Sequence, residues 1–413
     1  MLPSAPLALA LSLWLNAVMV AATLALLAVP ILAPLVLPAL GLPAEALGLY
    51  SGALWGASLI TSVAAGSLIR RRGAWRVAQA CLLLTALGLL CGAAGAVAGL
   101  LLAALAIGLA VGLETPAASQ LLARGLTVAQ RPLYFSIKQT GVQAGGLLGA
   151  LTLPWLAAQF GWQASLVALA LLALLLMLAL EQPRRRLGEL GEPGEQGGRG
   201  GPGQPTEGPA TAPLHFKAAL AWAWREPLLR RLALAAAAFG AVQLCLNSFM
   251  VTYAVLERGA TLAQAGLLLG VAQGGGLLGR LLWGWVAGRH GHALALLRAI
   301  GVAMTIAAAL LGGLGSGLAT GWLLPLVFIF GLTASGWNGV FLAEIAQQVP
   351  LARVAAATGA VLVVMTVGLM LAPLLFAAIG AARSFGAAYL VTAFIAAAGT
   401  LCLPGASGAK FRS

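Results

Sequence analysis

The stretch GSLIRRRGAWR (Gly66–Arg76) carries four arginines and separates two long runs of apolar residues. The run before it spans roughly 46–69 and the run after it roughly 75–94. Each run has the length of about 20 residues that a helix needs to cross roughly 30 Å of hydrocarbon. Because positively charged loops are retained on the cytoplasmic side, the stretch predicts a short cytoplasmic loop between two transmembrane helices.

The composition indicates a membrane protein along nearly the whole chain. Of 413 residues, 61% are hydrophobic and 8% are charged, whereas soluble domains contain about 25% charged residues. A soluble protein of this length would expose an aggregating apolar surface. The net charge is +13, from 23 Lys and Arg against 10 acids, all of them Glu. A nucleic-acid binder would carry such cations on a polar chain, so we expect the lipid bilayer as partner and no nucleic acid.

Twelve apolar runs are long enough to be transmembrane helices, which predicts an all-α membrane protein. The first run has no basic residue before it and is too long for a cleaved signal sequence, so we expect a retained helix. We also expect that Pro30, Pro34 and Pro38 interrupt it. The predicted spans are roughly 8–36, 46–69, 75–94, 97–123, 133–157, 163–180, 232–255, 262–288, 293–313, 321–346, 353–379 and 385–404.

The cations between the spans predict how the chain is oriented. If both termini are cytoplasmic, every Lys and Arg is assigned to the cytoplasmic side except Arg258 and Arg383. Such a bias fixes the topology of a membrane protein. An odd number of helices would scramble this pattern, so the bias supports an even number of spans and cytoplasmic N and C termini.

The segment from Glu181 to about Glu226 differs from the rest of the chain. It includes RRRLGELGEPGEQGGRGGPGQPTEGPA, which has almost nothing to bury and predicts a flexible cytoplasmic linker. Its last part, PLHFKAALAWAWREPLLRR, mixes tryptophans with cations and reads either as an interfacial helix or as an extension of the next span. We therefore expect an N-terminal six-helix bundle at 1–181, a linker at 182–228 and a C-terminal six-helix bundle at 229–413.

The two halves repeat one glycine pattern. A shift of 219 residues pairs Pro154 with Pro373, and a shift of 218 pairs Arg71 with Arg289. Parallel repeats of this kind occur in transporters whose substrate binds between two bundles. The shift of 218 residues also superimposes five glycines of one helix and its loop, Gly48, Gly52, Gly56, Gly66 and Gly73, on Gly266, Gly270, Gly274, Gly284 and Gly291.

The arginine loop and its weaker second copy, GWVAGRHGH (Gly284–His292), resemble the signature loop of the major facilitator superfamily. The resemblance covers nearly the whole chain. It implies two pseudo-symmetric six-helix bundles, the MFS fold, which expose a central small-molecule site alternately to the two sides without a cofactor. Arg70 and Gly288 stand where the family usually has Asp, so the charge latch of this loop is altered.

The residues of this loop have a conformational role in our interpretation. Small residues permit close helix approach in lipid, which we expect of Gly66 and Gly284. Gly73 and Gly291 suit sharp turns with positive φ. The arginines are expected to bind helix C termini or lipid phosphates, and they are Arg70, Arg71, Arg76 and Arg289.

The stretch FSIKQTGVQAGG (Phe135–Gly146) places polar side chains inside a predicted span. A cation in the bilayer costs about 2.5–3.5 kcal/mol on insertion scales unless it is solvated or paired. Lys138, Gln139 and Gln143 are therefore expected to face a cavity, or else Lys138 snorkels to the cytoplasm. The stretch resembles a bacterial branch of the superfamily that includes cyanate-type and organic-anion carriers, which implies a location in the bacterial inner membrane.

Glu114 is a second intramembrane charge. It precedes Arg124 by ten residues, which places it about 15 Å from the inner boundary and near the midplane. A carboxylate at this depth is a candidate proton carrier or counter-ion. Pro116 predicts a local break in the helix, whose freed backbone carbonyl needs a partner or water. Glu114 and Lys138 can pair, and the pair is either a working site or a structural bridge only.

The second half adds further candidates for a cavity. Arg280 is expected either to bind an anion as a bidentate fork or to brace the nearby loop. Trp337 and Asn338 lie deep enough to line a cavity. Asn16 in the first half is a weaker candidate, because one amide can satisfy itself against backbone, and Glu344 is expected to pair with Arg289 or Arg353. Other polar candidates are Gln243, Asn247, Ser248 and Gln273.

No catalytic or metal-binding motif stands out, so the chain is not expected to be an enzyme or to hold a cofactor or metal. The sequence predicts a monomeric secondary transporter for a small solute. An organic anion is favoured because Lys138 and Arg280 outnumber Glu114, through which any proton coupling would run. The alternatives are efflux of a drug or metabolite, with Glu114 recognising a cationic or neutral compound, and a non-transporting membrane sensor or scaffold.

Overall fold

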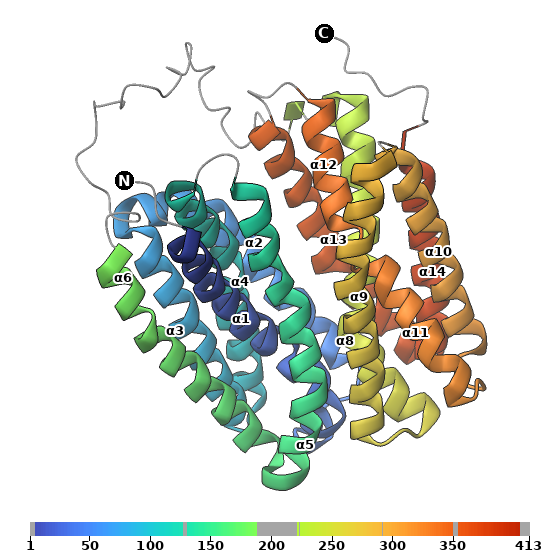
Figure 1. The fold of residues 1–413 in the computed structure, drawn as a ribbon. Coiled ribbons are helices and arrows are strands. Elements are labelled where there is room, and N and C mark those ends of the chain that lie inside the picture. Colours follow the sequence, from blue (N-terminus) through green and yellow to red (C-terminus); the bar gives the residue numbers. More distant parts are fainter. Residues whose placement is uncertain are drawn as a thin grey trace, which may run out of the picture.

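The computed structural model describes residues 5–126, 130–187, 221–222, 224–290, 292–349 and 354–404, and in these residues all regular structure is helical. The predicted all-α class is confirmed. The predicted linker lies largely outside the described residues. In chain order the helices in Figure 1 are α1 (Ala5–Ala39), α2 (Ala46–Arg72), α3 (Ala74–Ala93), α4 (Val97–Gly125), α5 (Arg131–Ala179), α6 (Glu181–Leu187), α8 (Pro227–Arg258), α9 (Leu262–His290), α10 (Ala293–Leu314), α11 (Thr320–Ala334), α12 (Asn338–Gln348), α13 (Val354–Ala382) and α14 (Phe385–Cys402).

Eleven helical segments of the described chain are long and apolar enough to cross a membrane. One of them, Leu133–Arg186, has 54 residues and contains two of the predicted spans. Its backbone leaves helical geometry at Gly161, where φ is 83° and ψ is 161°. The chain reverses direction there (Figure 1). A side chain is strained at such a φ, so glycine is the residue that permits this reversal.

One predicted helix interruption is absent from the structure, and one observed break was not predicted. α1 continues through Pro30, Pro34 and Pro38, so the expected break is wrong. Prolines are tolerated in membrane helices where neighbouring groups surround the freed backbone, and α1 is largely buried around them. The span predicted at 321–346 corresponds to the candidate membrane segment Thr320–Ile345. Its helix is divided, because α11 ends at Ala334 and α12 begins at Asn338.

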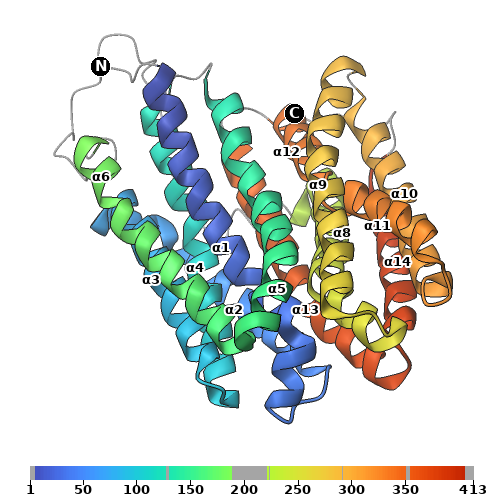
Figure 2. The ribbon, with the colours of Figure 1, turned by 60° about the horizontal axis from the view of Figure 1, so that its bottom comes forward.

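The helices before and after the linker gather on two sides of the molecule in both ribbon views (Figure 2). We refer to α1–α6 as the first half and to α8–α14 as the second half. Within the first half α1 packs on α5, and α4 packs on α2 and α3; within the second half α8 packs on α13, α9 on α11 and α10 on α14. The halves meet where α2 packs on α13, α5 on α9 and α1 on α8.

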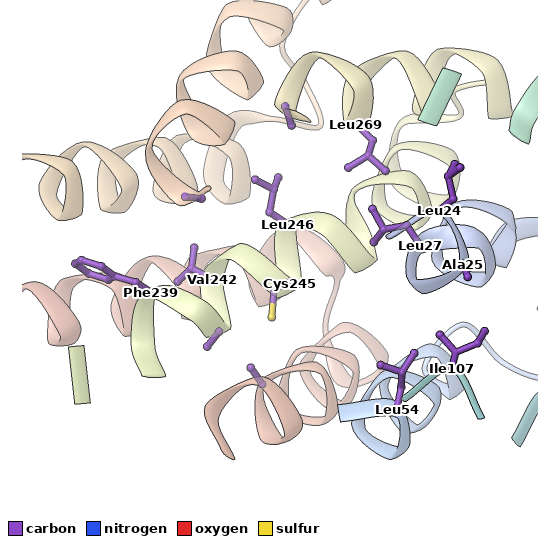
Figure 3. Close-up of a cluster of buried hydrophobic side chains, with 14 of the residues drawn as sticks. Leu24, Ala25, Leu27, Leu54, Ile107, Phe239, Val242, Cys245, Leu246 and Leu269 are labelled. Carbon is purple, nitrogen blue, oxygen red and sulfur yellow. The ribbon is translucent and has the colours of Figure 1, made fainter. Parts of the chain in front are cut away.

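The contact of α1 with the second half is apolar. Figure 3 shows Leu24 and Leu27 of α1 facing Leu246 of α8 and Leu269 of α9. All four side chains are at least 94% buried. Because lipid is as apolar as leucine, a contact of this kind between the halves is stabilised by close van der Waals packing.

The repeated glycines form the other two contacts between the halves. A Cβ on Gly48 of α2 would lie 2.6 Å from the carbonyl oxygen of Pro373 on α13. A Cβ on the equivalent Gly266 of α9 would lie 2.7 Å from Cγ of Pro154 on α5. The repeat found in the sequence therefore corresponds to two equivalent contacts. Both contacts lie near the first turns of α2 and α9. These turns are at the end of the molecule that lies away from Arg72, which we call the opposite end.

Pro116 in α4 acquires the partner that its sequence position predicts. A proline removes the donor for the carbonyl four residues earlier, which here belongs to Gly112. The hydroxyl of Ser62 on α2 donates to that carbonyl at 3.4 Å. The freed carbonyl therefore has a partner, but the expected local break is wrong, because α4 remains helical through the proline.

Helix α14 is capped at both ends by side chains from other helices. Glu257 of α8 accepts from the backbone N–H groups of Phe385 and Gly386 at its N terminus. Arg231 donates to the carbonyl of Cys402 at 3.0 Å, and Arg298 donates to that of Leu403 at 3.0 Å. An acid at a helix N terminus and cations at its C terminus both complement the helix dipole.

Candidate functional site

Glu114 and Lys138 form an ion pair inside the first half. Nζ of Lys138 lies 2.9 Å from Oε2 of Glu114, and each side chain is 3% exposed. Glu114 reaches this position from α4 and Lys138 from the first turns of α5. The alternative in which Lys138 snorkels to the cytoplasm is wrong, because its ammonium group is buried and has a carboxylate partner.

The surroundings of the pair are asymmetric. Oε2 of Glu114 accepts from Lys138 and from the hydroxyl of Thr115 at 2.9 Å, whereas Oε1 is buried without a hydrogen-bond donor. Lys138 also donates to Oε1 of Gln139 at 3.4 Å. The described residues therefore use the acceptor capacity of this carboxylate on one oxygen only.

Asn16 of α1 holds the backbone of α5 beside this pair. Its Nδ2 donates to the carbonyl of Ile137 at 2.7 Å and to the hydroxyl of Thr140 at 3.1 Å. Ser12, one turn earlier on α1, donates to the carbonyl of Tyr134 at 2.9 Å. These bonds fix the part of the α5 backbone from which the Lys138 side chain projects, so Asn16 positions the charged residue.

Arg280 of α9 crosses from the second half to the first. Its Nη1 donates to the backbone carbonyl of Gln139 at 3.2 Å, and its Nε donates to that of Ser335 at 3.3 Å. The guanidinium group thus joins α5 to the segment that follows α11. Because Gln139 also accepts from Lys138, two cations from different halves approach the same residue.

Two glutamines lie deeper in the contact between α5 and α9. Gln143 of α5 lies against Gly276 of α9, where an added Cβ would be 2.7 Å from Nε2 of Gln143. Gln273 of α9 lies against Gly146 of α5, where an added Cβ would be 2.6 Å from Cδ of Gln273. Each glutamine therefore occupies space that a glycine on the other helix leaves open. Ser335 contacts Gly276 as well.

These polar residues of the contact are buried without protein partners for several of their atoms. Gln143 and Gln273 are each 1% exposed, as is Ser335. Both Oε1 and Nε2 of Gln143, Oε1 of Gln273 and Oγ of Ser335 have no hydrogen-bond partner in the described part of the chain. Ser335 was missed as a candidate in the sequence; the signal was its place at the start of the polar SGWN segment.

The remaining second-half candidates lie in two environments. Asn338 donates to Oε1 of Gln243 at 3.2 Å, which ties α12 to α8, and Oδ1 of Asn247 is buried without a partner. Trp337 is completely buried, and its indole N–H donates to the carbonyl of Ala334 at 3.1 Å. Its ring packs edge-on against Phe239 and Phe341. In this conformation Trp337 is a packing residue of the second half.

The loop motif is only partly as expected. Gly73 has a φ of 79°, which confirms the predicted turn, whereas Gly291 lies outside the described residues. The expected close helix approach at Gly66 and Gly284 is wrong. An added Cβ on Gly284 would meet nothing within 4 Å, and one on Gly66 would meet only Arg70 of its own helix, at 3.6 Å. The reason is that the contacts between the halves made by α2 and α9 lie towards the opposite end of these helices.

The cations of the motif lie at the surface. Arg70 and Arg71 are exposed. Arg76 donates to Gln79 at 3.0 Å and lies 3.6 Å from Glu181, which ties α3 to α6. Arg289 lies over the ring of Trp285, with its Cζ 5.7 Å from the ring centroid.

Glu344 does not have the ion pair expected with Arg289. It is 4% exposed and accepts from Nε2 of Gln348 at 2.6 Å. Arg353, the other expected partner, lies outside the described residues. The described residues also contain no group of three or more His, Cys, Asp or Glu that could hold a metal ion.

Comparison with solved structures shows the same fold in several transporters. A bacterial homologue of the human lysosomal transporter Spinster, in an inward-facing and unoccupied conformation, has a TM-score of 0.74 at 18% identity, over 97% of this chain and 95% of that chain. The nucleoside transporter NupG has a TM-score of 0.75 at 14% identity, over 95% and 98% of the two chains. A peptide transporter, POT, has a TM-score of 0.72 at 17% identity, over 96% and 92%.

Comparison by sequence identifies the family. No curated protein matches the chain in sequence. The family model described as Major Facilitator Superfamily matches residues 10–360, which is most of the chain. The loop around Gly66–Arg76, the helical segments long enough to cross a membrane and the shared fold agree with this match. The chain is an integral membrane protein that belongs to the Major Facilitator Superfamily.

Proposed function

We propose that this protein is a secondary active transporter that moves a small organic anion by alternating access. The halves act as two six-helix bundles. The segment α5 crosses the membrane once before Gly161 and once after it, which gives twelve spans in all. Both termini and the linker are cytoplasmic, in a bacterial inner membrane, and the protein acts as a monomer. The distribution of its cations supports this orientation.

In this orientation the contacts described above support an inward-facing assignment. The contacts at Gly48 of α2 and Gly266 of α9 close the periplasmic end. The same two helices make no close contact with another helix at Gly66 and Gly284, near the cytoplasmic end. The alternate conformation would separate α2 from α13 and α5 from α9. A site reached from both sides in turn lies between these helices, where Arg280 meets α5.

The observation that supports an anion best is the approach of Arg280 and Lys138 to Gln139 from opposite halves. An arginine presents a rigid fork of donors that matches a carboxylate. A carboxylate bound by Arg280 and Lys138 would compete with Glu114 for the ammonium group. Glu114 would then take up a proton, because a carboxylate left unpaired in a buried site is costly. Anion binding and protonation of Glu114 are thereby coupled.

Uptake and efflux by the purified protein in proteoliposomes test this proposal. The panel contains organic anions and drug-like cations, each measured with and without a pH gradient. We expect uptake of anions that the gradient accelerates, and we expect Glu114→Gln to lose that acceleration. Full gradient dependence in Glu114→Gln would exclude its role as proton carrier.

The same panel separates the alternatives. Extrusion of cationic or neutral compounds in place of anions would identify an efflux transporter in which Glu114 recognises the substrate. A protein that moves no member of the panel in either direction would instead favour a membrane sensor or scaffold. The buried and unpartnered Oε1 of Glu114 is the observation that favours efflux as the second candidate.

A further inference from the structure

The contact between α5 and α9 contains more unpaired polar atoms than packing requires. Four atoms on Gln143, Gln273 and Ser335 are buried without a partner in the described residues. Leaving one buried donor or acceptor unpaired costs about 1–3 kcal/mol. Leucine or methionine would fill the same space without that cost. Unpaired groups of this kind in a native protein call for an explanation, and a ligand that pairs with them is one.

The position of these atoms continues the site around Arg280. Gln143 lies one helical turn beyond Gln139 on the same face of α5, because residues four apart share a face. Gln273 precedes Arg280 by two turns, on the face of α9 that meets α5. Arg280 and Gln139 are half-buried, whereas Gln143 and Gln273 are fully buried. A molecule held by Arg280 therefore lies next to the glutamines, at the edge of the contact that they seal.

The chemistry of the unpaired atoms defines what they recognise. Oε1 of Gln143 and Oε1 of Gln273 are neutral acceptors, which take an O–H or N–H donor. Nε2 of Gln143 is a donor, and the hydroxyl of Ser335 is both. A hydroxyl group donates one hydrogen bond and accepts others, so it matches this set. An ammonium group donates hydrogen bonds but accepts none, so it would leave Nε2 of Gln143 unpaired.

We propose that Gln143, Gln273 and Ser335 form a hydroxyl-recognising subsite, so that the transported anion is a hydroxycarboxylate. This inference rests on the proposed function, since Arg280 and Lys138 hold the carboxylate. The two glutamines come from different halves, and each lies over a glycine of the other helix. The hydroxyl group can enter only as α5 and α9 begin to separate. Recognition of the hydroxyl is thus tied to the opening of this contact.

Matched anions test the subsite directly on the full-length protein. Thermal unfolding in detergent is followed at increasing concentrations of L-malate or succinate, and of 3-hydroxybutyrate or butyrate. Within each pair the anions differ by one hydroxyl group. A ligand that binds the folded state stabilises it by RT ln(1 + [L]/Kd), so the rise in unfolding temperature at each concentration reports the affinity. We expect the hydroxylated member to bind at least tenfold more tightly in one or both pairs.

Variants then assign the preference to the subsite. Gln143→Leu should bring the affinities of the two members of a pair to within about twofold, while Gln159→Leu, which replaces an exposed amide of α5, should leave the preference intact. If Gln143→Leu does not fold, Gln273→Leu and Ser335→Ala serve the same purpose.

Three outcomes would overturn the inference. Equal binding of both members by the unchanged protein would refute the subsite while leaving anion transport standing. A preference that survives Gln143→Leu and Gln273→Leu would place hydroxyl recognition elsewhere. Binding of none of these anions would refute both the subsite and the proposed anion substrate.

Discussion

Substitution of Gly266 by alanine should weaken the contact that closes the opposite end of the molecule. The new Cβ would lie 2.7 Å from Cγ of Pro154, whereas carbon atoms in contact are about 3.5–4.0 Å apart. The α9 and α5 backbones must therefore separate by about 1 Å. The nearest atom is a backbone carbonyl oxygen, that of Ala150, which cannot rotate out of the way as a side chain can.

The size of the effect follows from the cost of overpacking. Inserting a methyl group into a packed contact costs about 1–3 kcal/mol. Because this cost applies only when α9 touches α5, it shifts the equilibrium between conformations by about 5- to 150-fold towards the one in which they separate. Gly48→Ala should act in the same way at the contact of α2 with α13. The free-energy costs of the two substitutions should add, since the two glycines are distant from each other.

Distances between spin labels provide the assay. Cysteines replace the exposed residues Pro43 and Ala263, which lie at the opposite end on different halves. The native cysteines are replaced first. In Gly266→Ala the distance distribution should shift to longer values, and the double variant with Gly48→Ala should shift it further.

A matched control exists on the same helix. A Cβ on Gly274 would meet nothing within 4 Å, so Gly274→Ala should leave the label distances unchanged. The reasoning is refuted if Gly266→Ala and Gly274→Ala give the same distribution, because the glycine at 266 would then have no steric role.

Three further substitutions probe the polar contacts. Glu114→Gln leaves the Lys138 ammonium group without its counter-charge and should lower the unfolding free energy by about 3–5 kcal/mol. Adding Lys138→Met to the same chain should restore most of this loss. If the effects of the two substitutions simply add in the double variant, the coupling is disproved. Glu257→Gln should cost about 1.5–3 kcal/mol in thermal unfolding, because two hydrogen bonds lose their charge. Ser62→Ala should cost only about 1 kcal/mol, since its bond to Gly112 is long; a loss above about 3 kcal/mol in the same measurement would contradict this weak role.

The helical segments could be predicted because hydropathy is summed over many residues. A run of about 20 apolar side chains leaves the chain few alternatives to a helix. Short features were less predictable. The break between Ala334 and Asn338 leaves the apolar character of the run unchanged, and the prolines of α1 are tolerated only because of what surrounds them. These outcomes depend on tertiary contacts that a window of sequence does not contain.

The charged site was predictable in part for a similar reason. Glu114 and Lys138 stand in apolar runs on neighbouring helices, so each required a partner and few were available. The acceptors of Arg280 were not predictable, because they are backbone carbonyls, which every residue has. The glycine repeat identified equivalent positions without showing which of them face the other half. Gly66 and Gly284 were therefore assigned a contact that Gly48 and Gly266 make.

The capping of α14 has a consequence for biosynthesis. This helix follows all of its capping residues in the chain, so Glu257, Arg231 and Arg298 are inserted before their partners are synthesised. Until α14 arrives, the acid lacks its backbone donors and the two arginines lack their carbonyl acceptors. A nascent second half without α14 therefore exposes unpaired charges at both of its ends. Docking of the last helix therefore completes the pairing of the charges at both ends of the second half.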